Sequence, residues 1–505
     1  MSQRSLRNSV FVLLAWCWAG AGAGIAAKGP TKKPGDLTWQ PYVLETTHGE
    51  KVDAELGTLQ VLENHARPEG RLIEISFVRL KSLSPHPGPP IVYLAGGPGG
   101  SGIDAARGPR YPLFAALRQV ADVIALDQRG VGLSAHVLML CRESWFYPVD
   151  RPGDLGGMIA LARQHSQSCA EFLAKNQFAA ASYNNDESAD DLEDLRRALG
   201  APRLDLWGVS YGTSLAFTML RRHPDRVHRA VLAGIEGPGQ ELRLPGDVQK
   251  LLEQVDRLVQ ADPAAHGAVP DFLGTVRTVL DRLGTQPVTV AVLDPLSDRK
   301  DQVTAGRFDL QMMTAQALAS SEGIRRLPGE YLRMSKGDFS ALSEFVHRRR
   351  KGWLGQAMPY LVACSLGTPP ERWARILKEE KETLLGRTAD FPYPEICEGW
   401  GLPAPRPETW SPVRSQVPVL LISGTLDGRT PPRNADEVAK GLPHAVRLLV
   451  ENAGHGDDLL LASPAIREAM AGFLGGGRLP SKRIALGPFR FDPVPAGTPA
   501  ATPAQ

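Results

Sequence analysis

The stretch that decides the fold of this chain is residues 204–214, Leu204-Asp205-Leu206-Trp207-Gly208-Val209-Ser210-Tyr211-Gly212-Thr213-Ser214. A short apolar run ends in Gly-x-Ser-x-Gly, and the residues after it have the apolar spacing of a helix. This pattern predicts a strand that turns sharply into a helix, with Ser210 at the bend. The positions two before and two after the serine meet neighbouring backbone in such a bend, and both are glycine. Ser210 is therefore the candidate nucleophile.

Strands and helices alternate on both sides of this stretch. Extended segments that read as an antiparallel opening to a sheet are expected at 38–46, 52–62 and 71–80. Further strands are expected at 91–94, 123–126, 228–235, 417–424 and 446–450, and helices at 113–120, 188–200 (with a serine cap), 434–441 and 464–474. The alternation predicts an α/β fold with a mostly parallel central sheet covered by helices on both faces.

The chain divides into segments of different composition. Arg4 and Arg7 precede a short apolar run that is followed by small residues, which predicts an export signal; an uncleaved anchor is the alternative. From about residue 240 to 412 the strand–helix alternation disappears over a length too great for a loop, which predicts a mainly helical cap. The predicted division is 1–27 signal peptide, 28–37 linker, 38–239 first part of the core, 240–412 cap, 413–476 second part of the core, and 477–505 C-terminal extension, Pro/Ala-rich and disordered at its end.

The charge of the chain is nearly balanced. It has 57 basic and 55 acidic residues among 505, so no nucleic-acid partner is expected. After cleavage of the signal, no membrane span is expected either. The one dense basic cluster, residues 347–351, is interpreted as a solvated helix face, with anion binding as the alternative.

Four cysteines remain outside the predicted signal, which contains Cys17. An even number in an exported chain indicates disulfides, and four free thiols are the alternative. Three pairings are possible, of which Cys141–Cys169 and Cys364–Cys397 keep each bridge within one insertion. No Cys/His spacing suits zinc, so no metal site is predicted. The expected location is secreted or periplasmic.

A serine nucleophile needs a base and an acid that orients the base. The candidate acid is Asp427, just after a predicted strand, and the candidate base is His455, just after the last predicted strand. Asp436 and Asp457 are rival acids, but one falls in a predicted helix and the other follows the histidine. The order Ser, Asp, His along the chain is the order that this strand–turn–helix architecture uses.

A glycine-rich segment, residues 95–102, follows the predicted strand 91–94. A tetrahedral intermediate requires two backbone donors, and we expect the N–H of Tyr211 and that of Gly97, because Pro98 has none. The phosphate-loop pattern Gly-x-x-x-x-Gly-Lys-Ser/Thr is absent, and the dinucleotide fingerprint lacks its acidic residue. No cofactor is predicted.

Three of these motifs together resemble the prolyl and tripeptidyl aminopeptidase branch of the α/β-hydrolases: Gly96-Gly97-Pro98-Gly99-Gly100, Asp127-Gln128-Arg129-Gly130-x-Gly132 and Gly208-Val209-Ser210-Tyr211-Gly212. The segment Cys397-Glu398-Gly399-Trp400 is similar to the carboxyl-terminal part of the secreted tripeptidyl enzymes. The resemblance implies an α/β-hydrolase fold with an inserted helical cap, and release of one or a few residues from a short peptide with a free amino terminus.

Such selectivity requires a carboxylate near the serine to pair with the substrate ammonium. Glu236, at the end of the strand beside the nucleophile strand, is the first candidate, and Glu398 is the second. Two other functions remain open: an esterase or amidase with the same three catalytic residues, and a non-catalytic binding protein on this fold.

Overall fold

The computed structural model of the protein describes residues 32–135, 140–295, 297–479 and 481–493. The predicted signal peptide, 1–27, and the final tail, 494–505, lie outside the described residues, as does the start of the predicted linker.

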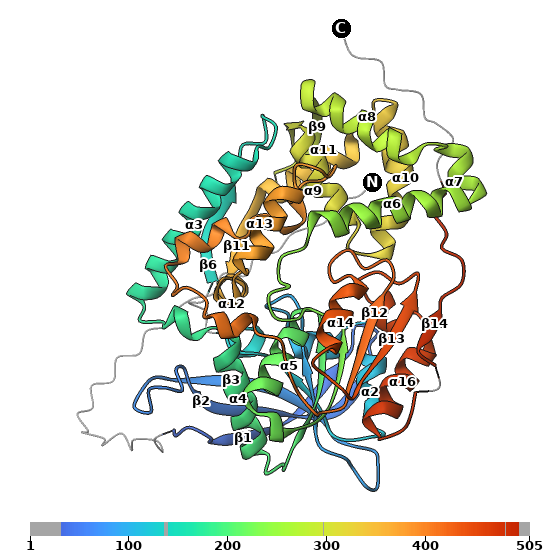
Figure 1. Cartoon of the computed structure of the whole chain (residues 1–505). Coiled ribbons are helices and arrows are strands. Elements are labelled where there is room, and N and C mark those ends of the chain that lie inside the picture. Colours follow the sequence, from blue (N-terminus) through green and yellow to red (C-terminus); the bar gives the residue numbers. More distant parts are fainter. Residues whose placement is uncertain (1–31, 136–139, 296, 480, 494–505) are drawn as a thin grey trace, which may run out of the picture.

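A ten-stranded sheet, counted over the described residues, forms the centre of the molecule (Figure 1). Its order is β1-β2-β3-β5-β4-β7-β8-β12-β13-β14. The strands are β1 (Leu37–Glu45), β2 (Lys51–Leu62), β3 (Leu72–Leu80), β4 (Ile91–Leu94), β5 (Val123–Leu126), β7 (Leu204–Val209), β8 (Val227–Ala233), β12 (Val419–Gly424), β13 (Ala445–Glu451) and β14 (Arg483–Ala485). The pairs among β1, β2, β3 and β5 are antiparallel, and the pairs from β5 to β14 are parallel. The predicted α/β class is confirmed; β14 is an additional strand in the predicted C-terminal extension.

Helices cover both faces of this sheet because side chains of a strand alternate between the faces. Val92 and Leu94 pack into one hydrophobic cluster with α4 and α5, whereas Ile91 and Tyr93 pack into another with α2 and α16. The core helices are α1 (Gly102–Arg107), α2 (Tyr111–Leu117), α4 (Asn185–Ala198), α5 (Tyr211–Arg222), α14 (Pro432–Ala439), α15 (Asp458–Leu461) and α16 (Pro464–Leu474).

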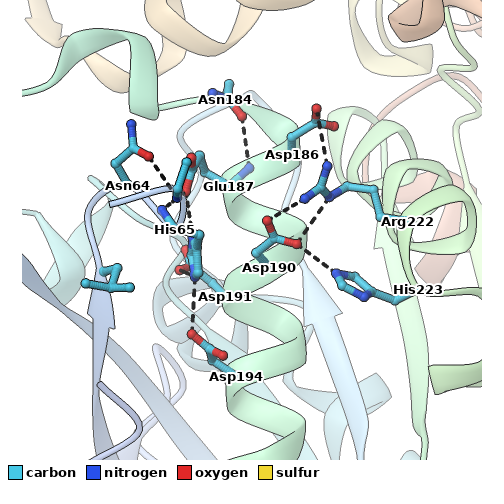
Figure 2. Close-up of polar contacts among 12 residues, drawn as sticks. Asn64, His65, Asn184, Asp186, Glu187, Asp190, Asp191, Asp194, Arg222 and His223 are labelled. Carbon is cyan, nitrogen blue, oxygen red and sulfur yellow. Dashed lines mark hydrogen bonds and ion pairs between the residues drawn. The ribbon is translucent and has the colours of Figure 1, made fainter. Parts of the chain in front are cut away.

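Helix α4 begins earlier than predicted, because Asn184 rather than Ser188 caps it: the Asn184 side chain accepts from the N–H of Glu187 at 2.9 Å. The acidic residues of α4 then meet basic partners from several elements (Figure 2). Arg129, fully buried, donates two hydrogen bonds to Asp191, at 2.7 and 2.8 Å. The Arg129 of the Asp-Gln-Arg-Gly motif therefore fixes α4 against the sheet.

Most of the segment predicted as a cap lies above the sheet in Figure 1 and packs into a separate hydrophobic cluster, which Tyr147, Met158, Leu426 and Phe489 from outside the segment also enter. Its helices are α6 (Pro245–Ala261), α7 (Pro263–Ala268), α8 (Phe272–Thr285), α9 (Arg307–Ala317), α10 (Ser321–Ser335), α11 (Ser340–Arg350), α12 (Met358–Leu366) and α13 (Pro370–Glu379). It also contains a hairpin of β9 (Val288–Asp294) and β10 (Arg299–Ala305), and a strand, β11 (Lys351–Gln356), none of which was predicted. Strand β11 pairs with β6 (Leu140–Phe146), so the insertion after β5 joins the cap.

Two disulfides connect the outer parts of this assembly. Cys141–Cys169 joins β6 to α3 (Leu155–Lys175), and Cys364–Cys397 joins α12 to the 3-10 helix Glu395–Trp400. Disulfide formation was predicted and is confirmed, in the pairing that keeps each bridge within one insertion. No helix in the described ranges combines the length and apolarity that crossing a membrane requires.

The interpretation of residues 347–351 as a solvated face is wrong for His347 and Arg350, whereas Arg348 and Arg349 are exposed. Arg350 is fully buried and ion-paired with Asp309 at 2.6 Å, and His347 is buried against Asp301 at 2.8 Å. Arg348 alone of the three arginines has an exposed partner, Glu344. Other elements of the cap pack around α11, and the charges of residues 347–351 by themselves do not indicate this packing.

Candidate active site

Ser210 sits at a strained bend between β7 and α5, with φ 55° and ψ −126°. A non-glycine residue adopts such angles at a cost of about 1–3 kcal/mol, which the surrounding structure must offset. The two flanking glycines allow the bend, because a Cβ at Gly208 would lie 2.6 Å from the carbonyl oxygen of Gly212 and one at Gly212 would overlap that of Leu94. The bend presents the serine side chain at the end of the sheet.

The register of the parallel strands brings distant segments to this bend. Leu94 of β4 pairs with Gly208 of β7, so the glycine-rich loop that starts at Ala95 lies beside Ser210. Ala233 of β8 pairs with Val209, which places Glu236 on the other side. Strands β12 and β13 then deliver the segments of Asp427 and His455 to the same edge.

Ser210, His455 and Asp427 form a chain of hydrogen-bond contacts. His455 Nε2 lies 2.9 Å from Ser210 Oγ, and His455 Nδ1 lies 2.9 Å from Asp427 Oδ2. The contacts join residues 245 and 28 positions apart in the sequence. In this arrangement the imidazole is placed to accept the serine proton while the carboxylate holds the ring.

Asp427 is buried and receives several donors besides His455. Its Oδ1 accepts from the N–H groups of Arg429 (2.8 Å) and Thr430 (2.7 Å), and its Oδ2 accepts from Thr430 Oγ1 (2.7 Å). Burial acts to raise the pKa of Asp427, but the charge of His455 and these hydrogen bonds outweigh it and hold the pKa below its usual range. Asp427 is thus held ionised. The rival acids are engaged elsewhere, Asp436 with Arg447 and Asp457 with Arg110.

The two expected oxyanion donors, Gly97 and Tyr211, line the same cavity as Ser210. The Tyr211 hydroxyl donates to Asn185 Oδ1 at 2.7 Å, so its ring points into the core and its backbone N–H stays at the start of α5. Gly97 has φ 128°, which only glycine adopts readily. A Cβ at Gly96 would lie 2.7 Å from the carbonyl oxygen of Val209, so a larger residue there would push the loop away from the bend.

The Asp-Gln-Arg-Gly motif holds the glycine-rich loop in place through hydrogen bonds. Asp127 accepts from Ser101 Oγ at 2.6 Å and from the N–H of Ile103 at 3.2 Å. Gln128 Nε2 donates to the carbonyl of Ala95 at 3.0 Å. These contacts explain why the motif accompanies the glycine-rich loop: it fixes the backbone that would face the oxyanion.

The cavity beside Ser210 has a volume of about 610 Å³, within the range of small-molecule and peptide sites. Its walls come from the loop after β8, from α12, from the loop 389–397 and from the segment after β12. The cavity therefore lies between the sheet and the elements that cover it. A cavity of this size has room for a small molecule or a short peptide beside Ser210.

Comparisons with known proteins show the family to which this fold belongs. A family model described as alpha/beta hydrolase fold matches residues 89–457. The chain belongs to this family. The tripeptidyl aminopeptidase of Streptomyces lividans is 23% identical over 518 residues, covering 94% of this hydrolase and 90% of the relative. The serine protease Hip1 of Mycobacterium tuberculosis is 28% identical over 193 residues (37% and 36%), and the proline iminopeptidase of Neisseria gonorrhoeae 26% over 148 residues (29% and 33%). The predicted fold class and the resemblance to this branch are confirmed.

Three acidic residues of the hydrolase line the cavity: Asp390, which pairs with Arg243, and Glu236 and Glu241. The Glu236 N–H donates to Thr213 Oγ1 at 2.8 Å, which ties the residue to the first turn of α5. Both side-chain oxygens of Glu241 are buried and have no hydrogen-bond partner among the described residues. Burial raises the pKa of Glu236 to about 7, and burial together with the charge of Glu236 raises that of Glu241 to about 8. A buried carboxyl group without a hydrogen-bond partner among the described residues, next to a second one in the same cavity, suits a cationic ligand.

Glu398 does not reach the cavity of the hydrolase. Its carboxylate is 2.6 Å from Arg163, its side chain is 64% exposed, and only its neighbour Cys397 lines the cavity wall. The short 3-10 helix around Cys397 turns the glutamate outward. We therefore withdraw Glu398 as a candidate for the substrate ammonium.

Sequence reasoning missed two residues of this site, Glu241 and Thr430. Glu241 follows Glu236 by five residues in a stretch without periodicity, and its only signal was its closeness to the end of β8. Thr430 bridges the acid and the base, at 2.7 Å from Asp427 Oδ2 and 3.0 Å from His455 Nδ1. A threonine three residues after a candidate acid was the signal available for it.

Proposed function

We propose that this protein is a secreted or periplasmic serine aminopeptidase that releases one or a few residues, in the prolyl or tripeptidyl manner, from the free amino terminus of short peptides. The observation that carries the proposal is the pair of carboxyl groups, Glu236 and Glu241, in the cavity of Ser210, where both oxygens of Glu241 lack a hydrogen-bond partner among the described residues. An ammonium group bound there would supply the hydrogen bonds that the buried Glu241 oxygens lack.

The proposed reaction proceeds through an acyl-enzyme. Ser210 Oγ attacks the scissile carbonyl while His455 Nε2 accepts the serine proton, and Asp427 stabilises the imidazolium that forms. The N–H groups of Gly97 and Tyr211 donate to the oxyanion. His455 then gives the proton to the leaving amine, and a water molecule activated by the same imidazole releases the product.

The covered cavity supports the choice of short peptides as substrates. A chain end that enters about 610 Å³ beside Ser210 is bound by its ammonium at Glu236 and Glu241, which fixes how many residues reach the nucleophile. The disulfides Cys141–Cys169 and Cys364–Cys397 suit an oxidising compartment, which supports the proposed location.

The test compares peptides that differ only at the amino terminus. Free peptides and their N-acetylated forms are incubated with the wild type and with Ser210→Ala, and products are identified by mass spectrometry. We expect the wild type to cleave only the free peptides, and Ser210→Ala to lose roughly 10⁴–10⁶ in kcat. Labelling by a fluorophosphonate that disappears in Ser210→Ala serves as the control for the nucleophile.

If acetylated peptides or simple esters are cleaved as fast as free peptides or faster, the protein is an esterase or amidase instead. A folded wild type that takes no fluorophosphonate label would favour a binding protein.

A further inference from the structure

Three arginines line the same cavity as Ser210. Arg243 comes from the loop before α6, Arg349 from the last turn of α11, and Arg429 from the segment after β12. They also line a smaller space of about 130 Å³, which lies between the cap and the segment of Asp427 and is lined further by Gln316 of α9. The three arginines therefore line both the large cavity and the smaller space.

Only one of the three has a carboxylate partner. Arg243 Nη1 lies 2.8 Å from Asp390 Oδ1. Among the residues that the structure describes, neither Arg349 nor Arg429 has a carboxylate within ion-pair distance. Both keep accessible surface although protein atoms surround most of each side chain, so that surface belongs to the cavity wall. On the same helix, Arg348 pairs with Glu344 and Arg350 with Asp309, so the unpaired state is particular to the arginine that faces the cavity.

Positively charged side chains lie close together in this part of the cavity wall. The nearby charge of Arg243, followed by burial, lowers the pKa of Arg429 to about 10, although Asp427, Glu236 and Asp390 act in the opposite direction. Burial likewise lowers the pKa of Arg349. Both remain charged near neutral pH, so an anion bound beside Arg429 would relieve its repulsion with Arg243.

We propose that Arg349 and Arg429 bind a carboxylate of the substrate, so that the cavity recognises a peptide by an anionic group as well as by its amino terminus. This inference rests on the proposed aminopeptidase function. The carboxylate is either the C-terminus of a very short peptide or the side chain of an aspartate or glutamate. Guanidinium groups are suited to either because their planar donors match a carboxylate in two parallel hydrogen bonds.

The cavity would then be complementary to a zwitterion. Glu236 and Glu241 offer negative charge, and Arg349 and Arg429 offer positive charge, while Arg243 and Asp390 neutralise each other. A peptide whose charged groups are spaced to reach both pairs would bind more tightly than one with either group blocked. Such selection would favour the final fragments of protein breakdown or peptides rich in acidic residues.

Binding to Ser210→Ala by calorimetry separates this proposal from the proposed function. Tri-, tetra- and penta-alanine are each used in four forms: free, N-acetylated, C-amidated and blocked at both ends. A second series places glutamate or glutamine at each position of the C-amidated peptides. We expect amidation of at least one length, or glutamine in place of glutamate at one position, to weaken binding roughly tenfold to hundredfold, as the loss of charge-assisted hydrogen bonds predicts.

The arginine variants assign the effect to the site. Arg349→Gln and Arg429→Gln are each combined with Ser210→Ala. In both, the dissociation constants of the peptide with the carboxylate and of its uncharged form should differ by less than threefold. Arg348→Gln removes one charge from the exposed face of the same helix and should keep the full difference. Arg349→Lys should recover part of it.

Each outcome bears on one proposal. If acetylation weakens binding but replacing a carboxylate by its uncharged form never does, the aminopeptidase proposal stands and the anion site is overturned. If a carboxylate matters and acetylation does not, the ammonium site is overturned. Equal loss in Arg348→Gln and Arg349→Gln would also overturn the anion site, because it would show an effect of net charge alone.

Discussion

Two acidic side chains, Glu236 and Glu241, set the chemistry of the amino-terminal subsite that we propose beside Ser210. Their pKa values, about 7 and about 8, mean that both carry a proton for much of the time near neutral pH. An ammonium ligand binds the ionised carboxylates more strongly than the neutral acids. Binding of the amino terminus must therefore release protons.

From this coupling we expect KM for a free peptide to fall roughly tenfold between pH 6 and pH 7.5, as the two carboxyl groups ionise. Above about pH 8 the fall should stop, because the peptide's own amino group loses its charge. Steady-state kinetics over pH 6–9 measure this, with KM separated from kcat. In Glu241→Gln the KM should be higher at all pH values, and its pH dependence should be weaker. An unchanged KM profile in that variant would exclude Glu241 from the ammonium site.

Helix α4 shows how a single element is fixed by charge. His65, in the turn that follows β2, lies 2.5 Å from Glu187 and 3.2 Å from Asp194 (Figure 2). Burial acts to lower the pKa of His65, but the hydrogen bonds to these carboxylates outweigh it and raise the pKa to about 9. The imidazolium therefore links β2 to the helix that precedes the nucleophile strand.

Because the pKa of His65 is higher in the folded protein than the ordinary 6.5, its contribution to stability is complete below pH 6.5. It is lost as the pH rises through 9. The free energy of unfolding of the wild type should exceed that of His65→Gln by on the order of 3 kcal/mol at pH 6, and the two should converge by pH 10.

Urea denaturation at pH 6 and pH 10 measures this difference. His86→Gln, at an exposed position, is the control and should track the wild type. A difference between wild type and His65→Gln that does not change with pH would contradict the assignment.

Each disulfide lies within one insertion, Cys141–Cys169 in the insertion after β5 and Cys364–Cys397 in the cap, and the pairing of β6 with β11 joins the two insertions. The bridges close segments of 28 and 33 residues. Loop-closure entropy predicts that each contributes about 3–4 kcal/mol to stability. Cys397 also lines the cavity, whereas Cys141 and Cys169 do not.

The two bridges should therefore differ in their effect on catalysis. Replacing either pair by serines should lower the midpoint of urea unfolding, but only the Cys364→Ser, Cys397→Ser double variant should raise KM, by roughly threefold to tenfold. The Cys141→Ser, Cys169→Ser variant is the matched control. An equal rise of KM in both would mean that the cap is displaced as a whole, not at the wall formed by Cys397.

The sequence by itself determined the order of most strands and helices, the bend at Ser210, the glycine-rich loop and the choice of Asp427 and His455. These features depend on periodicity and on backbone limits between near neighbours, such as the glycines at 208 and 212, and such limits are local. Disulfide formation was likewise readable from cysteine number and spacing.

Only the tertiary structure decided which charged side chains enter the cavity. Glu241 and Glu398 are both glutamates in irregular segments, yet one is buried beside Ser210 and the other pairs with Arg163 at the surface. Three consecutive arginines also have different surroundings: Arg348 lies at the surface, Arg349 in the cavity wall and Arg350 in the interior of the cap. The surroundings of a side chain come from elements far apart in the sequence, so no local pattern records them.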